Sequence, residues 1–456
     1  MIAVVALLLP SLAGANPKFR HTDLKRSEPA KGGRLSSAPT RISLWFIAKP
    51  QLAFSTIRLV GPSGEIALDA IVADTANSLH ANISRGLQAG DYRVHWQTAS
   101  ADGHPIRGEF VFTVLAIEGG TPPPALVVRV DTPSHAEHVQ DAEDPRRDDS
   151  GYRTARWFEF VALLSVLGAL GFRHGVLPPL AARGVPTADA SGRARRLGQS
   201  ILALYAIAAF VRLYTQSVAL HGREAALDPE AVGLILTRTT WGIGWSAGVL
   251  GAVFLLVGWS ISKRNVTIGT PLALTGALGM VLSPALSGHA AASQHFVLSV
   301  ALDMLHVAAA GLWLGGLLMV LFAGIPAMLQ LTNGNKQAAV SALVNSFHPL
   351  ALFCAPIAIF AGLGMSWLRL GGLDALWSTT YGRTLLVKLA LVALVLSMGT
   401  YNSLRARRRL SGGAEGDDRG TRRFRWTGSA ELALGAMVLV VTTFLVVTPV
   451  PTEIVP

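Results

Sequence analysis

Eight long apolar segments occupy the second part of this 456-residue chain. Each holds close to the roughly 20 apolar residues that an α-helix needs to cross a bilayer. Backbone polar groups in lipid must be bonded internally, and segments of this length achieve that as helices. We therefore expect an α-helical polytopic membrane domain with about eight transmembrane helices. The expected spans are 157–177, 199–220, 241–261, 266–286, 297–326, 349–369, 384–404 and 428–449.

The basic residues are distributed unevenly between the loops that join these segments. A net charge of +11 would suggest nucleic-acid binding in a soluble protein, but only 15% of this chain is charged. Most loop arginines and lysines fall in one set of alternate loops, which the positive-inside rule places in the cytoplasm. The other set holds only Arg223, Arg238, Arg369 and Arg383. We expect a multi-pass protein of the inner (plasma) membrane, with its N-terminal domain and C-terminus outside and no nucleic-acid partner.

The first part of the chain has the pattern of a small all-β domain. Short runs rich in β-branched and aromatic residues, such as RISLWFIAK (41–49) and DYRVHWQTAS (91–100), alternate with turn signals such as GPSGE and ADGHP. Several such strands within about 95 residues favour a compact antiparallel sandwich or barrel.

These patterns divide the chain into four parts. An apolar N-terminal run followed by Ala13-Gly14-Ala15 indicates a signal peptide over 1–15, although it lacks the usual basic start. The β-domain covers 16–118. A linker rich in proline and charge covers 119–152 and contains His135 and His138, and the membrane domain covers 153–456.

The stretch SADGHP (100–105) carries a candidate metal-binding pair, Asp102 and His104. Asp-Gly commonly forms the turn of a β-hairpin, so the histidine could simply follow a turn. Imidazole and carboxylate together also suit Cu(II), which prefers nitrogen and oxygen ligands. The residues alone leave both interpretations open. Further ligands would have to come from elsewhere, with His21, His95 and His80 as candidates.

Two stretches of the β-domain resemble the CopC family of periplasmic copper-binding proteins. They are HTDLKRSEPAKGG (21–33) and YRVHWQTASADGHPIRGEFVFTV (92–114). The resemblance implies an immunoglobulin-like β-sandwich that binds Cu(II) through His21, Asp102 and His104.

The chain departs from the CopC pattern in two ways. Cleavage after Ala15 would leave five residues ahead of His21, whereas the family histidine is usually the first residue and chelates with its own amine. Residues 16–116 also contain no methionine, so this domain cannot form the thioether Cu(I) site of some family members.

The membrane part resembles the CopD family of copper-resistance membrane proteins. The matching stretches are SGHAA (287–291), LHVAAAGLWLGGL (305–317) and YGRTLLVKLALV (381–392). CopC and CopD domains occur fused in this order, and the resemblance implies that copper moves inward across the membrane.

The fifth apolar segment places polar groups deep in the membrane. Asp303, His306, Ala310 and Trp313 fall at helical spacing on one face. His306 lies about 13 Å below the outer surface at 1.5 Å per residue. Ionisable groups at such depth usually line a functional pathway.

Two further histidines, His289 and His295, should lie at the outer mouth of this pathway and could receive copper there. Together with Asp303 and His306 they form the candidate membrane pathway.

We expect copper as the cofactor, and the copper ion and the bilayer as partners, in uptake or resistance. The periplasmic donor and cytoplasmic acceptor are open. The sequence shows no catalytic motif, and its one cysteine, Cys354, excludes a disulfide. Two alternatives remain: a membrane haem protein for electron transfer, which would need two facing histidines at one depth, and a copper sensor or scaffold that transports nothing.

Overall fold

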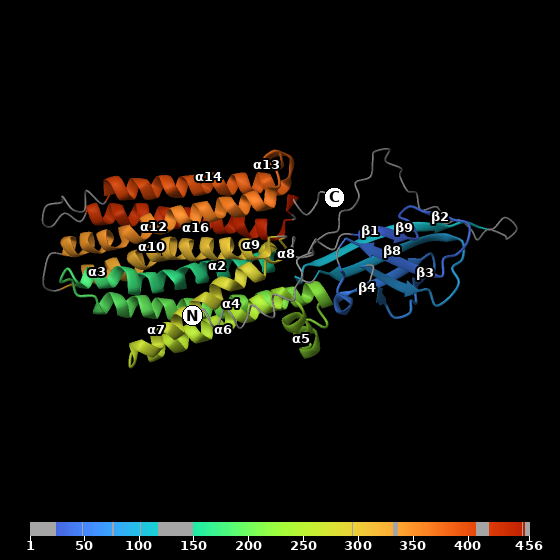
Figure 1. Cartoon of the computed structure of the whole chain (residues 1–456), viewed down its shortest axis with the longest axis horizontal. Helices are drawn as coiled ribbons and strands as arrows, with labels where there is room; N and C mark the ends of the chain where they lie inside the picture. The colour runs from blue at the N-terminus through green and yellow to red at the C-terminus, as the bar shows by residue number, and fades with distance from the viewer. Residues whose placement is uncertain are drawn as a thin grey trace. The chain divides into compact units, whose positions relative to one another are not determined.

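The computed structural model describes residues 24–47, 49–74, 77–100, 102–116, 149–293, 295–331, 336–406, 419–448 and 450–451. The expected signal peptide, His21 and nearly all of the expected linker lie outside these residues. Within them the chain forms two compact units. One unit holds the strands of 24–116 together with 216–240, and the other holds 149–215 and 241–451 (Figure 1).

The strands form two sheets. The first has the order β1 (Leu24–Glu28), β3 (Arg41–Phe46), β7 (Ser78–Asn82) and β6 (Val72–Asp74). The second has the order β2 (Arg34–Leu35), β9 (Pro105–Val114), β8 (Gly90–Ala99), β4 (Thr56–Gly61) and β5 (Gly64–Ile66). All neighbours are antiparallel except β2 and β9. The expected β-sandwich is confirmed.

Strand alternation builds the core of this sandwich. Along β8, Tyr92, Val94 and Trp96 are buried, whereas Arg93 and His95 are exposed, as expected when successive side chains point to opposite faces. The Trp96 ring meets Phe46 of the other sheet edge-on, with ring centres 5.4 Å apart. The long β8–β9 hairpin thus rests on a rigid core, and its turn carries the Asp-Gly-His sequence.

The membrane unit contains eight helices long and apolar enough to cross a bilayer, counted over the described residues, as expected from the sequence. They are Ser150–Ala181, Ala188–His221, Thr240–Ile261, Val266–Leu286, Phe296–Leu329, Lys336–Leu370, Thr380–Leu404 and Arg419–Val447. Their main helices are labelled α2, α4, α6, α7, α9, α12, α14 and α16 in Figure 1. The short helices α5 (Pro229–Arg238), α8 (His289–Ala292) and α13 (Ala375–Ser378) lie between them along the chain.

The first and fifth spans form the interior of the membrane unit. Of their most apolar windows, 78% of the first and 67% of the fifth are buried, against 11% of the seventh. The fifth span begins as α9 (Phe296–Ala310) and continues through two π-helical turns, η3 (Gly311–Gly315) and η4 (Val320–Gly324). Such π-turns within helices are frequent at functional sites.

Glycines let these two interior spans touch backbone to backbone. A Cβ atom built on Gly315 would lie 1.9 Å from the Leu164 carbonyl oxygen, and one built on Gly168 would lie 1.9 Å from the Gly315 carbonyl carbon. Small residues allow such close approach between membrane helices, where packing takes over the role of the hydrophobic effect. The close packing holds η3 firmly against α2.

This packing predicts that Gly315→Ala destabilises the membrane unit. The added methyl group has no space, so we expect the free energy of unfolding to fall by about 1–3 kcal/mol or more. The matched control is Gly192→Ala in α4, where a Cβ atom meets nothing within 4 Å. Thermal unfolding of both variants in detergent checks the prediction, and equal midpoints would contradict it.

Candidate metal centres

The Asp-Gly-His sequence forms the turn of the β8–β9 hairpin. The Gly103 amide donates to the Ser100 carbonyl at 2.9 Å, and the Ser100 amide donates to the His104 carbonyl at 3.2 Å. Gly103 has φ +82°, a left-handed conformation that glycine adopts without strain. The expected turn is therefore present.

The Asp102 carboxylate is held in place by this turn. Its Oδ1 accepts a hydrogen bond from the His104 backbone amide at 3.1 Å and another from the Ser100 hydroxyl. Asp102 and His104 are both half-buried. The turn thus brings two of the predicted ligands onto one short, fixed segment.

The other described histidines of the β-domain are His95 and His80, and each contacts a neighbouring side chain. His95 lies mid-strand in the second sheet, with its Nδ1 3.1 Å from Glu109 Oε2. His80 lies in the first sheet, with its Nε2 2.9 Å from the Ser78 hydroxyl. Both are strand residues with local partners, whereas Asp102 and His104 lie on a hairpin turn.

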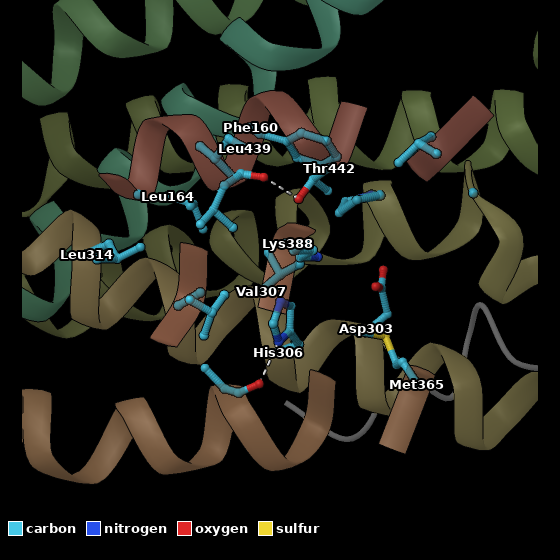
Figure 2. Close-up of a pocket in the computed structure, with 18 of the residues that line it drawn as sticks. Phe160, Leu164, Asp303, His306, Val307, Leu314, Met365, Lys388, Leu439 and Thr442 are labelled. Carbon is cyan, nitrogen blue, oxygen red and sulfur yellow. Dashed lines mark hydrogen bonds between the residues drawn. The ribbon is translucent and has the colours of Figure 1, made fainter. Parts of the chain in front are cut away.

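A cavity of about 170 Å³ lies among the helices of the membrane unit, and we name it the His306 cavity. Asp303, His306, Ala310 and Trp313 all line it, so the predicted face of the fifth span is confirmed. Figure 2 shows Asp303 and His306 from α9 beside Met365 from α12 and Lys388 from α14.

A backbone carbonyl fixes the orientation of the His306 ring. Its Nδ1 lies 2.6 Å from the Ala358 carbonyl oxygen, an atom that can only accept, so Nδ1 carries the proton of the neutral ring. The other side of the ring faces Lys388 (Figure 2). Gly362 makes room for the ring, since a Cβ atom there would lie 3.1 Å from both Nδ1 and Cε1.

The His306 cavity offers three kinds of potential metal ligand. The imidazole of His306, the carboxylate of Asp303 and the thioether of Met365 all line it. A histidine whose other nitrogen donates to a backbone carbonyl is the usual arrangement of a metal ligand. Three basic side chains, those of Arg156, Arg369 and Lys388, also line the cavity.

Sequence reasoning gave Lys388 no place among the candidate site residues. The sequence could have pointed to Lys388, because it is the one charged residue within LLVKLALVALVL. A lone lysine inside a membrane helix usually faces the protein interior.

A buried ion cluster lies on the neighbouring surface of α2. Glu159 accepts hydrogen bonds from Arg156, at 2.9 Å, and from Arg212 of α4. The Arg212 guanidinium also lies over the Trp241 ring, 4.7 Å from its centre. All three charged side chains are almost fully buried. This cluster ties α2, α4 and α6 together beside the cavity.

Of the two remaining histidines of the predicted pathway, only the side chain of His295 is described, and it is not among the residues that line the His306 cavity. His295 is exposed and directly precedes α9. His289 is the first residue of α8, and its side chain lies outside the description. Gly288 and Ala290 line the cavity, so the backbone around His289 borders it.

A second cavity of about 390 Å³ shares Trp313 with the first, and we name it the Glu431 cavity. Its lining includes His348 from α12, Asn402 from the π-turn η5 (Asn402–Ala406) and Glu431 from α16. Sequence reasoning did not select Glu431, although it is the one acidic residue in the last apolar segment.

Comparison with known proteins assigns a family to each part of the chain. The CopC domain model matches residues 24–115, the model of the copper resistance protein D-like N-terminal domain matches 147–296, and the copper resistance protein D model matches 341–445.

Individual proteins match over similar ranges. The copper transport protein CutJ of Bacillus subtilis is 25% identical over 464 residues, which cover 98% of this chain and 78% of the relative. Copper resistance protein C of Xanthomonas campestris is 31% identical over 118 residues, which cover 24% of this chain and 91% of the relative. The crystal structure of PcoC, a methionine-rich copper resistance protein from Escherichia coli, aligns at 32% identity and a TM-score of 0.20, covering 21% of this chain and 98% of PcoC.

The order of the matched models along the chain decides the classification. A CopC domain is followed by both parts of a CopD membrane domain, and together they match most of the described residues, the main exceptions being 297–331 and 336–340 between the two CopD models. The chain is therefore a CopC–CopD fusion, a multi-pass membrane member of the copper-binding resistance and transport family.

Proposed function

We propose that this protein binds Cu(II) in its β-sandwich outside the cell membrane and passes copper to its membrane domain, which carries it across the inner membrane. The proposal gives the chain a transport role without a catalytic step. The orientation in the membrane is inferred from the arginine-rich loops, which the positive-inside rule assigns to the cytoplasm.

The fixed hairpin turn supports the first step. Asp102 and His104 supply a carboxylate and an imidazole from one rigid segment, which suits Cu(II). Two ligands are too few for a tight site, and the family resemblance supplies His21 as the third. The mature N-terminus decides whether an α-amine joins them.

The orientation of His306 carries the second step. A neutral ring that donates from Nδ1 to Ala358 keeps the lone pair of Nε2 for a metal ion. Asp303 and Met365 line the same cavity, so a copper ion there meets hard and soft ligands together.

The nearby cations would keep this membrane site from binding copper too tightly. Lys388 and Arg369 line the cavity and oppose a further positive charge. A transport site must bind its ion well enough to admit it and weakly enough to release it. The mixture of ligands and cations in the His306 cavity fits that requirement.

The β-domain site predicts a graded response to substitution. Asp102→Asn keeps an oxygen that can accept the two turn hydrogen bonds but removes the charge, whereas Asp102→Ala removes both. We expect Cu(II) affinity to fall in the order wild type, Asp102→Asn, Asp102→Ala. The affinity of Asp102→Ala should be lower than that of the wild type by an order of magnitude or more. His104→Ala should resemble Asp102→Ala. Copper titration of the full chain, followed by electron paramagnetic resonance, measures the affinities.

His95→Ala is the matched control for these variants, because His95 is an exposed histidine of the same domain that pairs with Glu109. It should bind copper as the wild type does. Unchanged binding in Asp102→Ala and His104→Ala would refute the site and favour a sensor or scaffold that recognises a protein partner. N-terminal sequencing of the mature protein shows whether the chain begins at His21.

The membrane site predicts loss of copper transport when the His306 ring is removed or displaced. His306→Ala removes the imidazole, and Gly362→Ala pushes a methyl group against it. We expect Gly362→Ala to lower copper uptake about 10-fold, as disturbed support of a metal ligand typically does, and His306→Ala to lower it further. Uptake into proteoliposomes that contain the full chain is the measurement.

Gly192→Ala, which meets open space, serves as the control and should transport normally. Equal uptake in His306→Ala and wild type would refute the proposed route. A Soret absorption band that depends on His306 would instead support the haem alternative.

A further inference from the structure

Glu431 is a buried carboxylate in the Glu431 cavity to which the proposed copper route gives no role. It is 3% exposed and belongs to α16. The Asn402 amide donates a hydrogen bond to its Oε2 at 2.9 Å, and the Trp313 indole is its second hydrogen-bond partner. Both partners are neutral. Over the described residues, no lysine, arginine or histidine forms an ion pair with Glu431.

Glu159, the other buried carboxylate among the described residues of this unit, has the opposite surroundings. It is also 3% exposed, but two arginines donate hydrogen bonds to it. An ionised carboxylate in a low-dielectric interior is stable when paired in that way and costly when it is not. A carboxyl group without a cation avoids this cost by holding a proton. The contrast indicates that Glu159 is a structural anion and that Glu431 is a proton-holding group.

The surroundings of Glu431 leave space for a proton to arrive and leave. The carboxyl group borders a cavity of about 390 Å³. Gly399 leaves room for the carboxyl group, because a Cβ atom there would lie 3.2 Å from Oε1. The Asn402 Oδ1 is buried and has no hydrogen-bond donor among the described residues. A buried acceptor beside a carboxyl group is a ready partner for a hydroxyl proton or a water molecule.

Trp313 connects this group to the proposed copper position. It follows His306 by two helical turns, lines both cavities, and shares a hydrogen bond with Glu431. It lies within the π-turn η3, where the helix departs from regular hydrogen bonding. A shift of the indole when copper occupies the His306 cavity would therefore change the hydrogen bonding of Glu431.

We propose that Glu431 is a proton-binding site, and that copper arriving in the His306 cavity causes it, through the movement of Trp313, to release its proton into the Glu431 cavity. The coupling rests on the proposed copper transport, whereas the proton site does not. The ligand is a proton because Glu431 and Asn402 offer too few groups for copper. Over the described residues, no cluster of three His, Cys, Asp or Glu side chains is placed to hold a metal.

Other titratable groups near α16 must be distinguished from Glu431. Across the Glu431 cavity, α12 contributes His348. The packed helix α2 carries Arg156 and Glu159, which pair with one another, and α14 carries Lys388, which lines the other cavity. Tyr401 of α14 bonds to the exposed Arg423. The segments α10 (Gly316–Met319) and η4 carry no titratable side chain.

Infrared spectroscopy of the full chain in detergent tests the proton site directly. We expect the C=O stretch of a protonated carboxyl group at neutral pH in wild type and in Asp303→Asn, and its loss in Glu431→Gln. Glutamine preserves the size of the side chain and an acceptor for Asn402, and elution as a single species shows that the variant folds. Absence of the band in wild type, or its persistence in Glu431→Gln, would overturn the proposal.

The coupling is tested by adding Cu(I) anaerobically to the same samples. The carboxyl band should weaken in wild type, and the change should be several-fold smaller in Trp313→Phe, which keeps a ring but removes the indole N–H. His306→Ala should abolish the change. If the carboxyl band of the wild type does not change when Cu(I) is added, the coupling is refuted.

The two proposals can fail separately. If copper uptake occurs in proteoliposomes but no carboxyl band appears, the proton site is wrong and the transport route stands. If the band appears and depends on Glu431 but copper never crosses, the proton site stands and the transport route is wrong.

Discussion

The high cost of an unpaired charge in lipid governs the interior of the membrane unit. Glu159 shows how the cost is met, because its carboxylate accepts hydrogen bonds from Arg156 and Arg212, and Arg212 lies over the ring of Trp241. Three helices are fixed to one another by that single cluster. Where the same unit keeps ionisable groups beside a cavity, as with Asp303 and Lys388, the arrangement serves something other than cohesion.

Close helix packing fixes the positions of the helices that carry these ionisable groups. The glycine contact between α2 and η3 leaves no space for a side chain, so the α9–η3 helix cannot rotate freely against α2. His306 is fixed in turn by the Ala358 carbonyl, and Gly362, one turn farther along α12, leaves room for its ring. The position of one imidazole nitrogen thus depends on glycines in two other places. This explains why residues without any metal-binding chemistry are expected to control the site.

Much of this organisation could be predicted from the sequence. Hydropathy and length located all eight spans, and strand patterns located the sandwich. Helical spacing placed Asp303, His306, Ala310 and Trp313 on one face, because these residues share a single helix and need no knowledge of its neighbours. The Asp-Gly turn was equally local. His21 stays a prediction, since it lies outside the described residues.

The residues that escaped prediction come from other helices. Lys388 and Glu431 belong to α14 and α16, and hydropathy does not determine how those helices rotate or which neighbours they meet. The pairing of Arg212 with Glu159 depends on the same unknown, since the two residues are 53 positions apart. Both missed residues are nevertheless isolated charges in apolar segments. A charge that no residue of its own helix can neutralise implies a partner or a function on a neighbouring helix.

The α9–η3 helix is where the two proposed activities of the membrane domain meet. His306 and Trp313 lie on its one cavity-facing side, so an ion at the first residue and a hydrogen bond at the second act on a single rigid element. Coupling between sites requires such a shared element, with each ligand favouring one of its arrangements. Trp313 lies in the π-turn η3, where the helix departs from regular hydrogen bonding. The proposed exchange of copper for a proton would therefore need only a shift of the Trp313 side chain, while the glycine contact keeps the backbone of η3 against α2.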